Sequence, residues 1–156
     1  MQKITTFLWF DNNAEEAVNF YTSIFKDSKI TNMSRYSEAG PGPAGSVMVA
    51  NFTLNGQEFL ALNGGPMYKF TEAVSFVVNC ENQEEIDYYW DKLTAGGSEV
   101  QCGWLKDKFG LSWQVVPTAI GKLMSGDPVR SGRVATALYK MIKIDIAQLQ
   151  KAYDGE

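Results

Sequence analysis

Histidine, the side chain that most often carries acid–base or metal chemistry, is absent from this 156-residue chain. Because imidazole is the usual general base near neutral pH and the commonest metal ligand, the sequence excludes histidine-dependent triads and histidine-ligated metal sites. Cys80 and Cys102 are the remaining candidates for a thiol nucleophile. A reactive thiol needs a nearby cation or a helix N-terminus to lower its pKa, and the sequence favours inert thiols at both positions.

Two other kinds of motif suggest chemistry at first sight. The carboxylate pairs Glu15-Glu16 and Glu84-Glu85 fall in the first turns of expected helices, where negative charge favours the helix dipole and adjacent residues point to different faces. The glycine-rich loops 40–45 and 63–66 contain proline, and neither leads into a helix as a phosphate-binding loop does. We therefore expect structural roles for both motifs.

Aromatic side chains offer a third kind of chemistry, which is the binding of a flat or apolar molecule. Trp104 and Trp113 fall on consecutive expected strands. Side chains of this type could form the walls of a pocket for an apolar or planar ligand.

A repeated unit positions these candidate residues. Segment 13–21 resembles segment 82–90, which begins 69 residues further along the chain. Each starts with an Asn followed three residues later by a Glu, a pattern typical of a capped helix start, and continues with helical apolar spacing. A short apolar run that reads as a strand precedes each helix, over 4–10 and 74–78.

Further strands are expected after each helix, and one more helix at the end. The strand-like runs are 29–36, 47–54 and 58–63 after the first helix, and 99–104 and 111–116 after the second. Asn55-Gly56 joins two of them as a hairpin dipeptide. Apolar residues at near-helical spacing predict a single C-terminal helix within 131–153.

Composition limits the partners and the location. Hydrophobic residues make up 45% of the chain and the net charge is −4, without a basic run, which argues against nucleic acid or an anionic membrane as a partner. No apolar run approaches the roughly 20 residues of a membrane helix, and the first residues do not read as a signal peptide. Two cysteines are too few for a disulfide framework, so we expect a cytoplasmic protein.

Several stretches together resemble a known superfamily; they are 9–21, 63–66, 81–93 and 102–117, and the tail segment 139–147 also fits. In these stretches the chain resembles the vicinal oxygen chelate superfamily, which contains glyoxalase I, extradiol dioxygenases, and fosfomycin- and bleomycin-resistance proteins. More narrowly, it resembles the PhnB-like branch named 3-demethylubiquinone-9 3-methyltransferase.

The resemblance implies an α+β fold in which tandem βαβββ modules form a curled mixed sheet around a cavity, followed by a C-terminal helix. All of 1–156 would form a single domain, with module one over about 1–66, module two over about 70–117 and a helical tail over about 118–156. Proteins of this kind are commonly homodimers, so the resemblance also implies a homodimer.

The resemblance further implies where a metal would bind. In metal-using relatives, ligands project into the cavity from the first and last strands of each module. Carried over, these positions are Thr6 and Ser75, which the repeat also pairs, together with Ala61 or Leu62 and Gln114. A divalent ion prefers three or four carboxylate or imidazole donors. The side chains at these positions do not supply them, so we expect no metal and no other cofactor.

The favoured function is therefore metal-free binding of a small organic molecule. The candidate cavity residues are Thr6, Leu8, Ser75, Trp104, Trp113 and Gln114. One alternative is a metal-dependent lyase, isomerase or dioxygenase, for which Glu58 or Asp107 would have to turn inward. The other is a methyltransferase, as the family name suggests, although no glycine loop opening an alternating α/β sheet is readable. Whether any reaction is catalysed is left open at this point.

Overall fold

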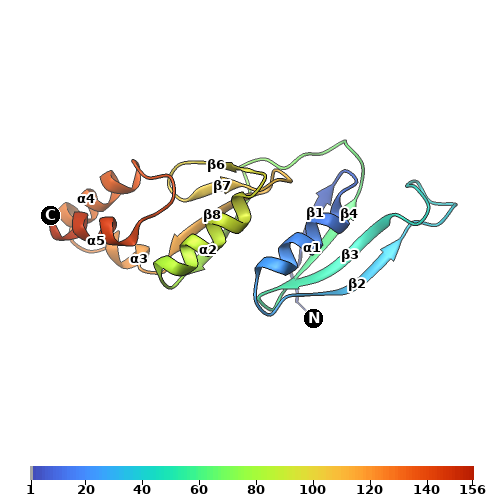
Figure 1. Cartoon of the computed structure of the whole chain (residues 1–156), viewed down its shortest axis with the longest axis horizontal. Coiled ribbons are helices and arrows are strands. Elements are labelled where there is room, and N and C mark those ends of the chain that lie inside the picture. Colours follow the sequence, from blue (N-terminus) through green and yellow to red (C-terminus); the bar gives the residue numbers. More distant parts are fainter. Residues whose placement is uncertain (1) are drawn as a thin grey trace. The chain divides into compact units, whose positions relative to one another are not determined.

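A computed structural model describes residues 2–156 (Figure 1). The chain forms two units of strands and helices, one after the other in the sequence. The first unit ends at Phe70, and the second is Thr71–Glu156. Each is built on a four-stranded sheet in which one outer strand runs parallel to its neighbour and the other pairs are antiparallel. The expected α+β fold with two modules is confirmed.

The first unit contains β1 (Thr6–Phe10), α1 (Ala14–Ile24), β2 (Lys29–Arg35), β3 (Val47–Leu54) and β4 (Gln57–Asn63). Its sheet has the order β1-β4-β3-β2. The Asn55-Gly56 turn joins β3 to β4, and both residues have the positive φ, 50° and 79°, that a tight hairpin turn requires. The three strands expected after the first helix are confirmed to within one residue at each end.

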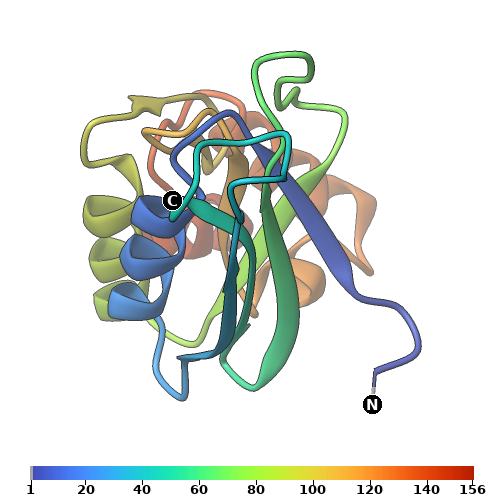
Figure 2. The same cartoon turned by 90° about the vertical axis from the view of Figure 1, so that its right-hand side faces the viewer.

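Helix α1 packs along one face of this sheet (Figure 2). The buried residues of the helix recur at three- and four-residue spacing; they are Ala14, Ala17, Val18, Tyr21 and Ile24. On the sheet, the rings of Phe52 and Phe59 are almost fully buried and stack with their centroids 5.4 Å apart. Burial of a side chain of this size stabilises a fold by about 1.5–3 kcal/mol, so this layer is the core of the first unit.

The start of α1 is capped by a residue distant in the sequence. Asn13 makes no capping hydrogen bond with its side chain, contrary to the expected cap. Instead, the Asn63 Oδ1 accepts a hydrogen bond from the Ala14 N–H at 2.9 Å, and the Asn63 Nδ2 donates to the Val47 carbonyl at 3.0 Å. Asn63, at the end of β4, therefore ties the helix start to two strands of the sheet.

The second unit begins with β5 (Ser75–Cys80), α2 (Gln83–Thr94), β6 (Ser98–Glu99), β7 (Trp104–Lys106) and β8 (Ser112–Pro117). Its sheet has the order β5-β8-β7-β6. The cap expected for the second helix is confirmed, because the Asn82 Oδ1 accepts from the Glu85 N–H at 2.9 Å. The Glu85 carboxylate in turn accepts from the Glu81 N–H at 2.8 Å.

The strand expected over 99–104 is wrong, because the chain turns within it. Cys102 and Gly103 have positive φ values of 61° and 81°, which no strand residue adopts. Their N–H groups donate to the carbonyls of Met141 and Ile142, both at 2.8 Å, rather than to a neighbouring strand. As a result β6 and β7 form a short hairpin, and β7 includes Leu105, which the sequence placed in a loop.

The C-terminal region is helical as expected, but the single helix expected within 131–153 is two helices, α4 (Pro128–Leu138) and α5 (Ile146–Asp154), and a short helix, α3 (Ile120–Leu123), precedes them. The segment between α4 and α5 leaves the helical path because its carbonyls bind the β6–β7 turn and because Gln83 bonds both the carbonyl of Ile144 and the N–H of Ile146. Met141 and Ile144 from this segment fill a core shared with Leu123, Val134 and Leu149.

Cys80 belongs to the buried layer between β5 and α2. Its side chain is fully buried. Burial raises the pKa of the Cys80 thiol to about 12, and the negative charge of Glu85 adds to the effect. A thiol in this state is a packing residue and a poor nucleophile.

None of the helices in residues 2–156 has the length and hydrophobicity needed to span a bilayer.

The Asn63 anchor gives a first prediction. Asn63→Ala leaves the Ala14 N–H and the Val47 carbonyl without this partner, and we expect it to lower the free energy of unfolding by about 1–3 kcal/mol. Asn13→Ala is the matched control, because Asn13 makes no capping bond, and it should cost less than about 0.5 kcal/mol. Urea unfolding followed by circular dichroism measures both; equal losses would contradict the assignment of the cap.

A second prediction concerns the Cys80 thiol. Its folded pKa lies above the unfolded value of about 8.5, so its stabilising contribution is complete below pH ~8.5 and is lost as the pH rises toward 12. Over this range the free energy of unfolding should fall more steeply for wild type than for Cys80→Ala, by up to about 1.4 kcal/mol per pH unit. Parallel slopes in urea unfolding from pH 8 to pH 10 would show that the folded thiol ionises normally.

Candidate functional site

The sheet of the second unit has two chemically different faces. Side chains alternate along each strand, so residues paired across strands share a face. Leu105, Trp113 and Val115 are buried on the face that α2 covers. The other face, here called the open face, carries Ser75 and Val77 of β5, Trp104 and Lys106 of β7, and Ser112 and Gln114 of β8.

Gln114 and Ser75 form a polar pair on the open face. The Gln114 Nε2 donates to the Ser75 Oγ at 3.0 Å in a partly buried position. Trp104 pairs with Gln114 across β7 and β8 and Val77 pairs with it across β5 and β8, so an aromatic and an aliphatic side chain flank the amide. A neutral hydrogen-bonding group between apolar side chains is typical of a site that orients an organic ligand.

Ser112 completes the polar part of this face. It lies in register between Ser75 on β5 and Lys106 on β7. Its side chain is fully buried, and its Oγ has no hydrogen-bond partner among the described residues. A buried hydroxyl without a partner costs about 1–3 kcal/mol, so the Ser112 hydroxyl lowers the stability of the second unit.

An exposed ion pair lies at the same row. The Lys106 ammonium pairs with the Glu72 carboxylate, and the two side chains are 40% and 58% exposed. The hydrogen bond from Lys106 holds the pKa of Glu72 below its usual value, so Glu72 is charged at neutral pH. Glu72 shortly precedes β5 and Lys106 is on β7, so the pair joins the segment before β5 to a strand on the other side of β8.

Trp113 and Asp107 lie away from this face. Trp113 is 4% exposed on the α2 side, and its Nε1 donates to the Asp107 Oδ2 at 2.9 Å. The Asp107 Oδ1 also accepts from the N–H groups of Phe109 and Leu111 at 2.9 and 3.0 Å. Trp104 and Trp113 therefore point to opposite faces of the sheet. The Asp107 carboxylate stabilises the turn between β7 and β8 with its hydrogen bonds.

In the first unit, Thr6 and Leu8 are on the face that α1 covers. Thr6 pairs with Phe59 and Leu8 pairs with Ala61, and both partners are buried in the layer under α1. The two cavity candidates from this unit thus share a face with the core. Phe7, which lies between them in the sequence, is 51% exposed on the opposite face of the sheet.

Thr6 and Ser75 lie on different faces because the connection between the first strand and the helix differs by one residue between the two modules. Buried helix residues correspond at the offset of 69 that the sequence shows, as with Tyr21 and Trp90. Buried strand residues correspond at an offset of 70, as with Phe10 and Cys80. Three residues separate β1 from α1, whereas two separate β5 from α2. Since a shift of one residue moves a side chain to the other face, the counterpart of Ser75 is Thr5 and not Thr6.

The same register identifies the counterparts on the last strand. Phe7 pairs with Leu60 as Val77 pairs with Gln114, so Leu60 takes the place of Gln114 in the first module. Ala61, one of the two positions expected there, is fully buried under α1. Thr5, Leu60 and the exposed Glu58 line a hollow of about 200 Å³, the first-module equivalent of the open face.

A divalent metal does not fit either face. No group of three or more Cys, Asp or Glu side chains is arranged to hold an ion within residues 2–156. The open face offers two hydroxyls and one amide, and Glu58 is the one carboxylate lining the hollow of the first unit. Such donors are too few and too weak for the ions that metal-dependent enzymes use.

The two glycine-rich loops meet around one pocket of about 340 Å³ in the first unit. Their glycines make room for aromatic rings, because a Cβ at Gly42 would collide with the Tyr36 ring and one at Gly64 with the Trp9 ring. The Tyr36 hydroxyl donates to the Asn63 carbonyl at 2.7 Å. These contacts give the loops a structural role.

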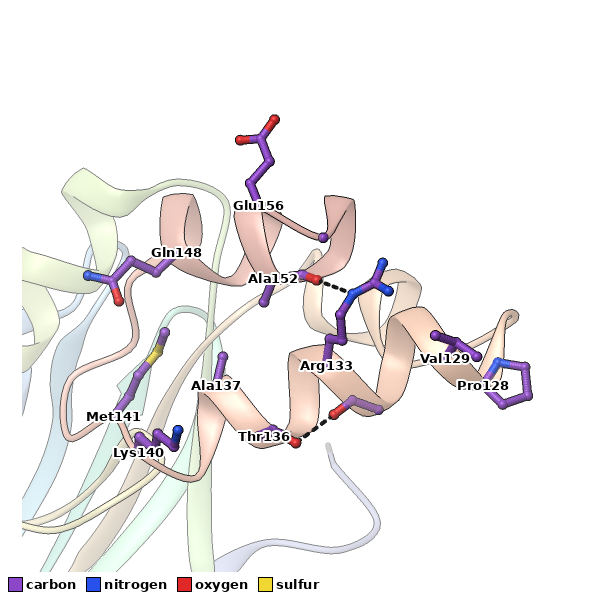
Figure 3. Close-up of a pocket in the computed structure, with 12 residues that line it drawn as sticks. Pro128, Val129, Arg133, Thr136, Ala137, Lys140, Met141, Gln148, Ala152 and Glu156 are labelled. Carbon is purple, nitrogen blue, oxygen red and sulfur yellow. Dashed lines mark hydrogen bonds between the residues drawn. The ribbon is translucent and has the colours of Figure 1, made fainter.

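Another hollow is a groove of about 830 Å³ between α4 and α5 (Figure 3). Arg133 extends from α4 to α5, where its Nε and Nη2 donate to the carbonyls of Ala152 and Tyr153, both at 2.8 Å. Two donors of this guanidinium are therefore used in hydrogen bonds to the last turn of α5. Small residues such as Gly132 and Ala137 form much of the remaining wall.

Comparison with known proteins identifies a family for the two modules but not for the C-terminal helices. The family model described as 3-demethylubiquinone-9 3-methyltransferase matches residues 2–116. It stops before the three C-terminal helices, so it does not extend to the fit expected at 139–147. No curated protein matches the chain.

Solved structures with the same fold also match about three quarters of this chain. A PhnB protein from Bacillus cereus with the same family name is 47% identical, with a TM-score of 0.71 over 75% of this chain and 100% of that chain. Protein PA1353 from Pseudomonas aeruginosa is 21% identical, with a TM-score of 0.62 over 75% of this chain and 98% of that one. The fosfomycin resistance protein FosX from Listeria monocytogenes, solved with Mn(II) and sulfate, is 15% identical, with a TM-score of 0.51 over 75% and 91%.

The last two similarities show the fold alone, whereas the family model and the Bacillus cereus structure establish membership. The chain therefore belongs to the PhnB-like family named 3-demethylubiquinone-9 3-methyltransferase.

Proposed function

We propose that this protein binds a small organic molecule on the open face of the second sheet, without a resident metal. The observation that carries the proposal is the Gln114–Ser75 hydrogen bond on a face flanked by Trp104 and Val77. A neutral amide and a hydroxyl can orient a polar group of a ligand, while apolar side chains remove its hydrocarbon part from water.

Each side chain has a distinct part in this proposal. The Gln114 amide has one Nε2 hydrogen directed at Ser75 and a second donor and a carbonyl oxygen with which to meet a ligand. The Trp104 indole supplies a flat apolar surface against which a ring can stack. Val77 is 49% exposed and adds an aliphatic contact.

The two alternative activities have less support. Metal-dependent chemistry needs a donor set that neither face provides. Methyl transfer from a nucleotide-like donor usually uses a glycine loop between the first strand and its helix. Here those connections are Asp11-Asn12-Asn13 and Glu81-Asn82, without glycine.

A homodimer in the cytoplasm is part of the same proposal. Phe7, on the face of the first sheet away from α1, is 51% exposed, and Val77, on the open face of the second sheet, is 49% exposed. Val74, next to β5, is 66% exposed. Apolar surface of this kind is commonly covered by another copy or another module. We propose that two such sheets close around a cavity as one domain, within one chain or between two copies; light scattering after size-exclusion chromatography distinguishes a dimer from a monomer.

A third prediction tests the binding site. In a thermal-shift screen of a small-molecule library, compounds that bind should raise the melting temperature of the wild type by mass action. Gln114→Ala should weaken a hit by roughly two- to tenfold, the loss of about one hydrogen bond, and Trp104→Ala should weaken it further. Gln150→Ala, on the exposed side of α5, is the matched control and should leave the affinity unchanged.

The metal-free character is tested in the same assay. MnCl₂ and a chelator should each leave the melting temperature and the affinity of a hit unchanged. A stoichiometric transition metal that survives purification, with binding lost on chelation, would contradict the proposal.

A further inference from the structure

Three polar side chains form a row across the second sheet. Lys106 on β7 pairs with Ser112 on β8, and Ser112 pairs with Ser75 on β5. The row lies beside the Gln114–Ser75 pair, at the end of the open face where β5 begins.

Each hydroxyl of the row retains a hydrogen-bonding capacity. The Ser75 Oγ accepts from the Gln114 Nε2, so its own proton is available to donate. The Ser112 Oγ is fully buried and makes no hydrogen bond with any described residue. Buried hydroxyls are nearly always bonded, and an unbonded one within a polar row indicates that a partner is missing.

A carboxylate already pairs with the ammonium at one end of this row. Glu72 reaches from the segment before β5 to the ammonium of Lys106, the residue that pairs with Ser112 across β7 and β8. Glu72 belongs to a segment without helix or strand, and both members of the ion pair are substantially exposed. Exposed pairs of this kind are weak, so an external anion can compete with Glu72 for the ammonium.

We propose that Lys106, Ser112 and Ser75 form a subsite for the carboxylate group of the ligand, and that Glu72 pairs with the Lys106 ammonium of this subsite when the ligand is absent. The inference rests on the proposed function, since it assigns a chemical class, a small organic carboxylate, to the molecule that binds beside Gln114 and Trp104. One ammonium matches a monoanion, and two hydroxyl donors match the two oxygens of a carboxylate.

Glu72 then acts as an internal competitor. A ligand carboxylate must displace it, which lowers the apparent affinity by the fraction of molecules in which the subsite is closed. Removing the charge at residue 72 should therefore tighten the binding of carboxylates and leave neutral analogues unaffected. A side chain with a purely structural role would not produce this difference.

Benzoate and its neutral analogue benzamide are the probes for a fourth prediction, with dissociation constants measured by nuclear magnetic resonance titration of the full chain. Wild type should bind benzoate at least threefold more tightly than benzamide. Glu72→Gln should tighten benzoate binding by threefold or more without changing benzamide binding, whereas Lys106→Gln should abolish the preference for benzoate. Glu84→Gln and Lys92→Gln, exposed on α2, are the charge-matched controls and should change neither constant.

Ser112→Ala separates binding from folding. The variant removes an unpartnered buried hydroxyl, so its melting temperature should equal or exceed that of the wild type, while its affinity for benzoate should fall. A drop in melting temperature together with unchanged benzoate binding would overturn the role of Ser112.

The subsite is overturned if benzoate binds no more tightly than benzamide, if Glu72→Gln leaves the benzoate constant unchanged, or if benzoate does not bind at all. The proposed function fails by a different result, namely that no library compound binds in a manner sensitive to Gln114. Benzamide binding that is weakened by Gln114→Ala, without any preference for benzoate, would support the proposed function and reject the carboxylate subsite.

Discussion

The alternation of side chains along a β-strand is the constraint on which the rest of this structure depends. Each strand has one face under a helix and one face away from it, so successive side chains point alternately into the helix-covered core and to the other face. Ser75, Ser112 and Gln114 are all on the second face. Trp113, directly between Ser112 and Gln114 in sequence, is buried on the first.

The one-residue difference between the modules shows how strict this constraint is. The helices of the two modules present equivalent residues to their sheets, with Tyr21 matching Trp90. The longer connection between β1 and α1 then changes which strand residues correspond, so that Thr5 and not Thr6 matches Ser75. A repeat detected in the helices thus does not determine the faces of the strands.

Much of the architecture was predictable from sequence, because helices and hairpins leave strong local signals. The helical repeat, the Asn82 cap and the Asn55-Gly56 turn were all readable in this way. The faces of β1 were not, because Phe7, Leu8, Trp9 and Phe10 are all apolar and show no alternation. The break between α4 and α5 was missed because its hydrogen bonds go to Gln83 and to the β6–β7 turn, both distant in the sequence.

The candidate site was predictable only in part, for the same reason. Ser75, Trp104 and Gln114 were named from sequence and lie on one face, whereas Thr6, Leu8 and Trp113 lie on helix-covered faces. Ser112 and the Glu72–Lys106 pair were missed. An unsatisfied hydroxyl and an ion pair across a strand depend on register, and no local pattern encodes them.

This chain places its own set of polar groups on a fold that it shares with other proteins. FosX, which has the same fold, was solved with Mn(II), whereas this chain has no histidine and offers hydroxyls, an amide and one paired ammonium on its open face. Those groups can recognise a ligand without the help of a metal. The same scaffold can therefore support different chemistry, because the fold fixes the positions and the side chains decide what binds.

The central claim is that Gln114, Ser75 and Trp104 share the open face whereas Thr6 lies under α1, and nuclear Overhauser contacts in solution test it most directly. The account predicts contacts from the Gln114 side-chain amide protons to the protons of Ser75 and Trp104, together with contacts from the Thr6 methyl group to the ring of Phe59. Contacts from the Gln114 amide to Ile86 or Leu93 on the buried side of α2, with a solvent-exposed Trp113 indole, would contradict it.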